Sequence, residues 1–337
     1  MKVLVYFQPS SKHDNFEGAR MRKTIKGALE VIGGSYTSNL YDDYDVAHFM
    51  SPDDENKLNI VLERKVPVVV SALFGEDDPA TRFLINKNKD GRITVALKNK
   101  ALKMLNKATL VLVPSESAKE LLIANGVNRP IEIVVPGVNL ARFNFSREDE
   151  KELFYRYFRE DKNKKLVLAL GEYSNNMDGI HCLINAAKKK EDAVFYYIGS
   201  ETLITGKAKK IIRSAPKNLH FKSILPDDIY RSMLLNADVF MLPGYNLSGI
   251  VSIEEAMAAN CQLIVRKSAT FSEFVKNEKT AYVAEYSETL TSLCLDYLNG
   301  QIKPTTEEAY NLISNYNLEN FGQNLMKVYE SLVTNQK

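Results

Sequence analysis

Cysteine and histidine are scarce in this sequence of 337 residues, and tryptophan is absent. The three cysteines, Cys182, Cys261 and Cys294, are an odd number without CxxC spacing, which excludes the disulfide framework of a small secreted domain. The histidines, at positions 13, 48, 181 and 220, form neither an HxxxH nor an HExxH pattern. We therefore expect reduced core cysteines, no metal site and no cofactor.

Charge of one sign and long apolar runs are also missing. The 44 basic and 42 acidic side chains give a net charge of +2, which disfavours nucleic acid as a partner. The run Val66–Phe74 is broken by Pro67 and Ser71 and is far shorter than the ~20 residues that cross a bilayer. The stretch Val3–Phe7 is too short for the ~7–15-residue core of a secretory signal. We expect a cytoplasmic protein.

What the sequence does contain is short β-branched runs that alternate with helical patterns. This alternation is typical of βαβ units and predicts an α/β fold with parallel sheets. The predicted strands are Val3–Phe7, Val46–Phe49, Pro67–Ser71, Thr109–Val113, Ile131–Val134, Leu166–Leu170, Ala193–Ile198, Leu219–Lys222, Val239–Leu242, Gln262–Val265 and Ala281–Val283. The helices predicted in the first half are Gly18–Ile32, Asp54–Glu63, Val95–Asn106 and Ser117–Asn125. Ser115 should cap the last of these helices, and Gly126 should end it.

The length favours two domains, because a domain typically has about 100–200 residues. The sequence becomes strongly charged between Phe143 and Lys165, and a new buried strand follows. We therefore predict an N-terminal domain over residues 1–150 and a second domain over residues 151–317. Each should be a doubly wound, Rossmann-like sheet, and the two should face a central cleft. The helix in residues 318–337 is expected to pack back on the first domain.

Ligands of open α/β sheets bind beyond the carboxyl ends of the strands, so the strand-exit loops are the candidate site. The loop after the strand Val239–Leu242 carries glycines and leads into a helix, and such a turn can hold a phosphate at the helix N-terminus or can simply be a βα turn without a ligand. Glu254 and Glu255 follow in that helix, where they could accept ribose hydroxyls or only complement the helix dipole. The loop from Gly171 to Gly179 has the shape of a ligand loop but contains no Lys or Arg.

Several motifs together carry a resemblance. In the second half they are Leu168–Glu172, Asn236–Pro243 and Glu255–Arg266; in the first half they are Asp45–His48, Leu105–Ser117, Pro136–Asn139 and Phe143. This pattern resembles the retaining, two-Rossmann (GT-B) glycosyltransferases over essentially the full chain. It is most similar to the bacterial branch that glycosylates glycosyl-diacylglycerols.

The resemblance implies a nucleotide-sugar donor, such as a UDP-sugar, that is bound mainly by the second domain. It also implies an acceptor held mainly by the first domain and transfer with retention and without a metal. By position, Glu255 would bind the donor ribose, Gly249 and Ile250 would offer backbone amides to the pyrophosphate, and Gly18 and Arg20 would belong to the loop after the first strand. The donor-binding residues expected from the loops and the resemblance together are Gly171, Glu172, Gly244, Tyr245, Asn246, Ser248, Gly249, Ile250, Glu254 and Glu255.

Three features depart from the family pattern. Counting back eight residues from Glu255 or Glu254 reaches Leu247 or Asn246, so the first of the family's paired glutamates is missing. The basic pair of the first exit loop in the second domain is also missing, as is the histidine expected within Ser71–Phe74. A charge-assisted phosphate contact contributes about 1.5–3 kcal/mol, so this loss would weaken donor binding unless other cations replace the pair. The candidates are Lys207, Lys209, Arg266 and Lys267.

The segment from Arg92 to Lys107 interleaves apolar residues at helical spacing with lysines at positions 98, 100, 103 and 107. A basic amphipathic helix of this kind can lie on an anionic membrane surface, or it can be a core helix with a solvated face. The possible membrane contacts are Lys98, Lys100, Lys103 and Lys107.

Two functions follow from the sequence. The first is a metal-independent hexosyltransferase that uses a nucleotide-diphosphate sugar and a lipid or saccharide hydroxyl, with no catalytic side chain assigned. A lipid acceptor would place this enzyme peripherally on the inner face of the membrane. The alternative is a glycosyltransferase-like protein that has lost donor chemistry and serves as a binding or partner subunit of an active enzyme.

Overall fold

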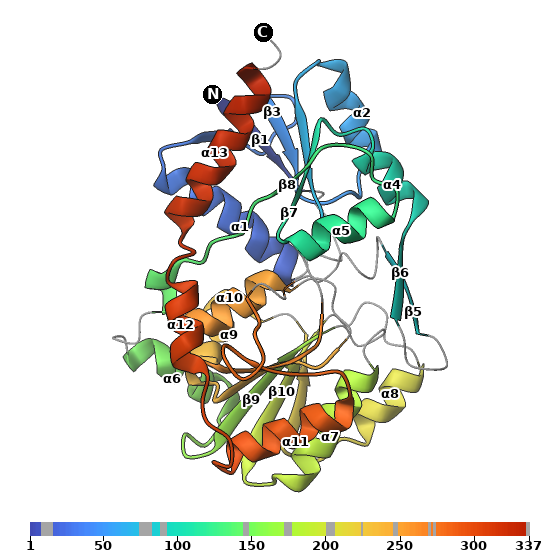
Figure 1. The fold of residues 1–337 in the computed structure, drawn as a ribbon. Coiled ribbons are helices and arrows are strands. Elements are labelled where there is room, and N and C mark those ends of the chain that lie inside the picture. Colours follow the sequence, from blue (N-terminus) through green and yellow to red (C-terminus); the bar gives the residue numbers. More distant parts are fainter. Residues whose placement is uncertain are drawn as a thin grey trace.

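A computed structural model describes residues 1–7, 16–73, 83–87, 93–143, 148–171, 177–199, 206–223, 225–244, 249–268, 271 and 274–334. The chain forms two parallel sheets stacked end to end, with helices on both faces of each (Figure 1). The α/β fold of two Rossmann-like halves predicted from the sequence is therefore confirmed.

The first sheet has six strands, and all of its pairings are parallel. In spatial order these are β2 (Ser35–Thr37), β1 (Lys2–Tyr6), β3 (Val46–Phe49), β4 (Val68–Ser71), β7 (Leu110–Val113) and β8 (Ile131–Ile133). Strands β1, β3, β4 and β7 are buried along almost their whole length, because helices cover both faces of the sheet. The helices of this half are α1 (Phe16–Val31), α2 (Glu55–Glu63), α4 (Asn99–Leu105) and α5 (Glu116–Ala124).

The second sheet repeats this plan, again with six strands and only parallel pairings. Its spatial order is β11 (Leu219–Lys222), β10 (Ala193–Ile198), β9 (Lys165–Leu170), β12 (Val239–Leu242), β13 (Gln262–Arg266) and β14 (Tyr282–Ala284). The helices are α6 (Glu148–Phe158), α7 (Met177–Lys189), α8 (Gly206–Arg213), α9 (Asp227–Asn236), α10 (Ile250–Ala258), α11 (Ser287–Leu298) and α12 (Thr306–Ile313). Between β9 and β12 the strand order reverses, which places the ligand-binding edge at the exits of these two strands.

Two stretches connect the halves. A short 3₁₀ helix, η1 (Leu140–Phe143), lies between the two sheets, and the last helix, α13 (Leu318–Thr334), returns to the first half and packs along α1. A Cβ atom built on Gly322 would stand 2.3 Å from the carbonyl oxygen of Ala28, so the backbones of α13 and α1 approach as closely as only glycine permits.

A buried polar cluster ties α13 to the first sheet. His48 on β3 is fully buried, and its Nδ1 and Nε2 atoms lie 2.7 Å from the Tyr329 hydroxyl and 2.6 Å from the Ser71 hydroxyl. Burial lowers the pKa of His48 to about 3, so the ring is neutral at physiological pH.

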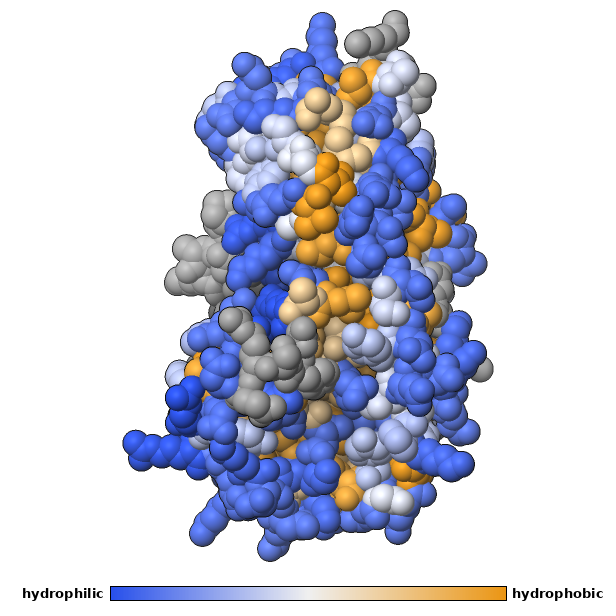
Figure 2. Space-filling model, turned by 90° about the vertical axis from the view of Figure 1, so that its left-hand side faces the viewer, coloured by the Kyte–Doolittle hydropathy of each residue, from blue (hydrophilic) through white to orange (hydrophobic). Residues whose placement is uncertain are grey.

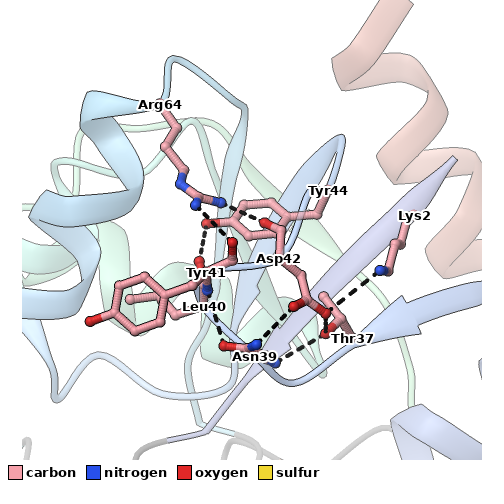
Figure 3. A network of polar contacts seen from close by, with 8 residues as sticks. All are labelled: Lys2, Thr37, Asn39, Leu40, Tyr41, Asp42, Tyr44 and Arg64. Atoms are coloured by element: carbon pink, nitrogen blue, oxygen red, sulfur yellow. Dashed lines mark hydrogen bonds and ion pairs between the residues drawn. The ribbon is translucent and has the colours of Figure 1, made fainter.

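The connection between β2 and β3 is held by a second polar network (Figure 3). Arg64, at the end of α2, donates to the carbonyl oxygens of Asp42 and Tyr41 and stacks over the ring of Tyr44. Thr37 donates to the Asp42 carboxylate at 2.6 Å, and this hydrogen bond lowers the pKa of Asp42. All of these contacts lie within the first half, so the network stabilises the β2–β3 connection.

One expectation about the elements was wrong in part. The predicted helix Val95–Asn106 begins only at Asn99, because Ile93–Leu97 forms strand β6, which pairs antiparallel with β5 (Phe83–Lys87). The alternation of Ile93, Val95 and Leu97 with Thr94 and Ala96 has the period of a strand, and this outweighs the helical spacing of the apolar residues. The predicted cap is confirmed: the Ser115 hydroxyl accepts a hydrogen bond from the Ala118 amide at 3.1 Å, and Gly126 has a φ of +89° beyond the helix end.

Candidate functional site

The exits of β9 and β10 are packed against each other at the edge that faces the first half. The Gly171 amide donates to the Ile198 carbonyl oxygen at 3.1 Å, and a Cβ atom built on Gly199 would lie 2.0 Å from the Gly171 carbonyl oxygen. Any side chain at position 199 would therefore push the start of the β9 exit loop away. Glu172, predicted in that loop, lies outside the described residues.

The exit of β12 leads into the N-terminus of α10. Gly244 and Gly249 are both buried, and Gly249 precedes the helix with a φ of +126°, a conformation that favours glycine. Ile250 is the first helical residue, so the free amides of the first turn begin at this point. Tyr245, Asn246 and Ser248, predicted in the same loop, lie outside the described residues.

A buried ion pair joins the two halves beside this helix. The side chain of Arg20, on α1, is 4% exposed, and its Nη1 donates to Oε2 of Glu255 at 2.7 Å. Its Nη2 donates to the Ser252 hydroxyl at 2.7 Å, and its guanidinium carbon lies 4.8 Å from the ring centroid of Tyr230. The carboxylate of Glu255, which is predicted to bind the donor ribose, thus pairs with the guanidinium of Arg20 from the first half.

The position of Arg20 corrects the expectation that Gly18 and Arg20 lie in a loop. Helix α1 begins at Phe16, so both residues belong to its first two turns. A single glycine costs a helix about 1 kcal/mol, which good helix formers around it can offset.

Glu254 differs from Glu255 although the two are adjacent. The Glu254 residue is 1% exposed, and neither of its carboxyl oxygens has a hydrogen-bond partner among the described residues. Burial, followed by the neighbouring Glu255 carboxylate, raises the pKa of Glu254 well above its usual range. Both effects favour the neutral form of the Glu254 carboxyl.

An interdomain cavity of about 120 Å³ lies between α1, η1 and α10. Its lining residues are Arg20, Lys23, Thr24, Gly27, Gly137, Val138, Asn139, Arg142, Phe143, Val251, Glu254, Glu255 and Leu318. Beside it, Asp227 at the start of α9 lies 2.6 Å from Nη2 of Arg142 and 3.4 Å from Nζ of Lys23. Although burial opposes ionisation of Asp227, these two cations lower its pKa.

Two of the four cations considered as replacements for the missing basic pair are engaged elsewhere. Arg266 donates to the carbonyl oxygens of Pro243 and Glu285 and to the Ser287 hydroxyl. Its guanidinium therefore holds the start of the β12 exit loop. Lys267 pairs with the Glu285 carboxylate at 2.8 Å. Lys209 is exposed on α8, and the side chain of Lys207 lies outside the described residues.

The predicted membrane-contact lysines surround the short helix α4. Its apolar residues Ala101, Met104 and Leu105 are buried in the core of the first half, so this face cannot insert into a bilayer. Lys100 and Lys103 are exposed, whereas Lys107 pairs with Glu55 at 2.6 Å. Lys98 precedes the helix and is half-buried. Only an electrostatic contact with a membrane remains open to these lysines.

Within the described residues, no three His, Cys, Asp or Glu side chains cluster closely enough to bind a metal ion. Over the same part of the chain, no helix has the length and apolar character needed to cross a membrane.

Comparison with known proteins indicates the family of the second half. Residues 150–315, which contain the second sheet and α10, match the family described as Glycosyl transferases group 1. This part of the chain is a group 1 glycosyltransferase domain. A processive diacylglycerol alpha-glucosyltransferase of Acholeplasma laidlawii is 22% identical over 337 residues, which cover 99% of both chains. The predicted resemblance to glycosyltransferases of the bacterial glycolipid branch is therefore confirmed.

Solved structures confirm the fold of the whole chain. Anabaena Alr3699/HepE, solved with UDP and glucose, is 14% identical, with a TM-score of 0.72 over 98% of this chain and 100% of that one. A sucrose-phosphate synthase of Thermosynechococcus elongatus is 12% identical, with a TM-score of 0.74 over 99% of each chain. The two Rossmann-like halves are thus the two lobes of the GT-B fold.

The sequence predicted Glu255, Arg20 and the glycines around α10 as site residues, but not the other residues that surround the Arg20–Glu255 pair. Lys23 lies three residues after Arg20, and this spacing puts both on one face of α1. The spacing of Arg20 and Lys23 is visible in the sequence, but nothing in the sequence says which residues of the second half this face of α1 contacts. Asp227, Arg142 and Ser252 were missed for this reason.

Proposed function

We propose that this protein transfers a hexosyl group from a UDP-sugar to a hydroxyl of a diacylglycerol-type lipid, with retention of anomeric configuration and without a metal ion. The names of two similar proteins support the two substrates: one is a diacylglycerol alpha-glucosyltransferase, and another was solved with UDP and glucose. A lipid acceptor requires contact with a membrane surface, so the protein would act as a peripheral membrane enzyme.

The geometry at the start of α10 carries the proposal. Gly249 turns the chain with a positive φ so that α10 begins at the edge of the sheet, and Glu255 lies in the second turn of the same helix. The first-turn amides and the positive end of the helix dipole would hold the donor diphosphate, as helix N-termini hold anions. The Glu255 carboxylate would accept hydrogen bonds from the ribose hydroxyls.

Arg20 supplies positive charge where the β9 exit loop has none. Its guanidinium reaches the first turn of α10 through Ser252, so it lies one helical turn from Gly249. In the proposed complex, Arg20 and the ribose share Glu255, and the cation faces the diphosphate from the first half. A charge-assisted contact of this kind contributes about 1.5–3 kcal/mol.

The chemistry needs little from a side-chain base. The departing diphosphate can accept the proton of the attacking hydroxyl, because both lie on the same face of the sugar in a retaining transfer. The absence of a histidine in Ser71–Phe74 is compatible with this route, and the Ser71 hydroxyl instead contacts His48. The role of the chain is then to hold the acceptor hydroxyl and the leaving diphosphate on the same face of the sugar and to stabilise the leaving group.

A second function is favoured by one observation. The carboxylate expected to bind ribose already forms a buried ion pair with Arg20. If that pair leaves Glu255 unable to bind ribose, the donor site is closed and the protein would act as a partner subunit of an active glycosyltransferase.

A transfer assay separates the two functions. Purified protein is mixed with UDP-glucose or UDP-galactose and with vesicles that contain diacylglycerol or monoglucosyl-diacylglycerol. We expect an α-linked glycolipid product and a kcat/KM at least ten times lower in Glu255→Ala, whereas the variant Glu191→Ala, at an exposed position before β10, should match the wild type. No product with any donor and acceptor pair, under conditions where a diacylglycerol glucosyltransferase is active, would contradict the enzymatic function.

A further inference from the structure

The interdomain cavity contains a polar group that the proposed transfer reaction does not use. Glu254 lines this cavity, is 1% exposed, and has two carboxyl oxygens without a hydrogen-bond partner among the described residues. A buried polar group without a partner is costly, and in native proteins such groups usually meet a bound water, ion or ligand. The cavity beside Glu254 is where that partner would bind.

The charges around the cavity indicate which kind of ligand fits. Arg20 is neutralised by Glu255 at 2.7 Å, whereas Lys23 and Arg142 share the single carboxylate of Asp227. Burial raises the pKa of Glu254 and so favours its neutral form, which adds no negative charge and can donate a hydrogen bond. The group therefore has one positive charge in excess, which favours an anion and disfavours a metal cation.

The size of the cavity limits the ligand further. A volume of about 120 Å³ exceeds the roughly 10–15 Å³ that a single water needs, and it is far below the ~300 Å³ of a typical cofactor pocket. The lining also includes the apolar side chains of Val138, Phe143 and Val251. A compact oxyanion matches this volume, and a nucleotide or an oligosaccharide does not.

We propose that the interdomain cavity is a binding site for a small oxyanion, phosphate or a carboxylate, held by the Glu254 carboxyl as hydrogen-bond donor and by Arg142 and Lys23 as cations. The three residues belong to α10, to η1 and to α1, so the bound anion joins the two lobes at the segment that connects them. The cavity shares Arg20 and Glu255 with the proposed donor site, but Glu254, Arg142 and Lys23, which hold the anion, have no part in that donor site. Its occupancy favours the lobe arrangement described here.

The test is a titration of the full chain with sodium phosphate and, in a second arm, sodium acetate, at ionic strength held constant with sodium chloride. Binding is read as the shift in melting temperature and by calorimetry. UDP is present at saturation if it binds, so that phosphate cannot occupy the donor site. We expect saturable binding of phosphate, of acetate or of both, and the arm that saturates at lower concentration identifies the preferred oxyanion.

Four variants locate the binding. Arg142→Gln and Glu254→Leu should each weaken the apparent affinity at least tenfold, whereas Glu254→Gln, which keeps a neutral donor of the same size, should stay within about threefold. Arg129→Gln, which changes an exposed arginine of the first half, is the matched control and should bind as the wild type does.

Two results would overturn the site: no stabilisation by either anion beyond that of chloride, or saturable binding that persists in both Arg142→Gln and Glu254→Leu. Arg142→Gln keeps the test decisive if Glu254→Leu does not fold. The proposed transferase function fails on different evidence, because loss of UDP binding with intact phosphate binding would contradict only the donor site.

Discussion

Single residues in this protein often act across long sequence separations. His48 contacts Tyr329 from the last helix and Ser71 from the neighbouring strand, and all three are buried. Arg20 contacts Glu255 from the other lobe. A local cap such as Ser115 could be predicted from the sequence because its partner, Ala118, lies three residues away. The His48 and Arg20 contacts could not, because their partners are set by the packing of whole elements.

The neutral state of His48 has a consequence for stability against pH. Its pKa is about 3 in the folded chain and about 6.5 when unfolded, so between these values the unfolded chain binds more protons. The stability that His48 contributes is full above pH 6.5 and is lost as the pH falls toward 3. We expect the difference in unfolding free energy between wild type and His48→Gln to shrink by up to about 1.4 kcal/mol per pH unit below pH 6.5.

Urea unfolding of both proteins between pH 7.5 and 5 measures this difference. Because groups common to wild type and variant cancel, the remaining slope belongs to position 48. A difference that stays constant over this range would show that the His48 ring ionises equally in the folded and unfolded chain, which would contradict its burial as a neutral group.

Among the elements, the buried strands were the easiest to predict. The ranges of β3, β10, β11 and β12 match the prediction, and β10 and β12 are continuous apolar runs, as expected of parallel strands covered on both faces. The prediction missed β2, which has only three residues at the sheet edge and no visible period. It also placed a helix over β6, where a strand pattern and a helical pattern overlap in the same residues.

The contact between α1 and α13 depends on a glycine. A Cβ at position 322 would lie 2.3 Å from a backbone oxygen of α1, which cannot move aside without the helix. We expect Gly322→Ala to destabilise the protein by about 1–3 kcal/mol, in the range of overpacked cores. Gly206→Ala is the control, since a Cβ there meets nothing within 4 Å. Thermal unfolding of the two variants decides the point, and equal melting temperatures would mean that α13 is not closely packed on α1.

On the scale of the whole molecule, the GT-B architecture could be predicted, but the relation between its lobes could not. The alternation of strands and helices appears twice in the sequence and gives two sheets. The face of α1 that meets α9, η1 and α10 becomes visible only in three dimensions, and it brings together Arg20, Lys23, Asp227 and Glu255.

The surface also separates two features that a lipid-modifying enzyme could use. Figure 2 shows a band of apolar side chains on the face that carries α13, where a groove is lined in part by Ile32 and Met326. Helix α4 lies on the opposite side of the first lobe from α13 (Figure 1). The basic helix predicted from the sequence therefore does not combine with this apolar band into one amphipathic surface.

The central claim is that α10 and Glu255 form a donor site for a UDP-sugar. The most direct measurement is calorimetric titration of the folded protein with UDP, UDP-glucose and UDP-galactose, for the wild type and for Glu255→Ala. We predict micromolar binding of UDP and of at least one sugar nucleotide, with a Kd raised at least several-fold in Glu255→Ala. No detectable binding of any of the three to folded wild-type protein, or an unchanged Kd in the variant, would contradict the account.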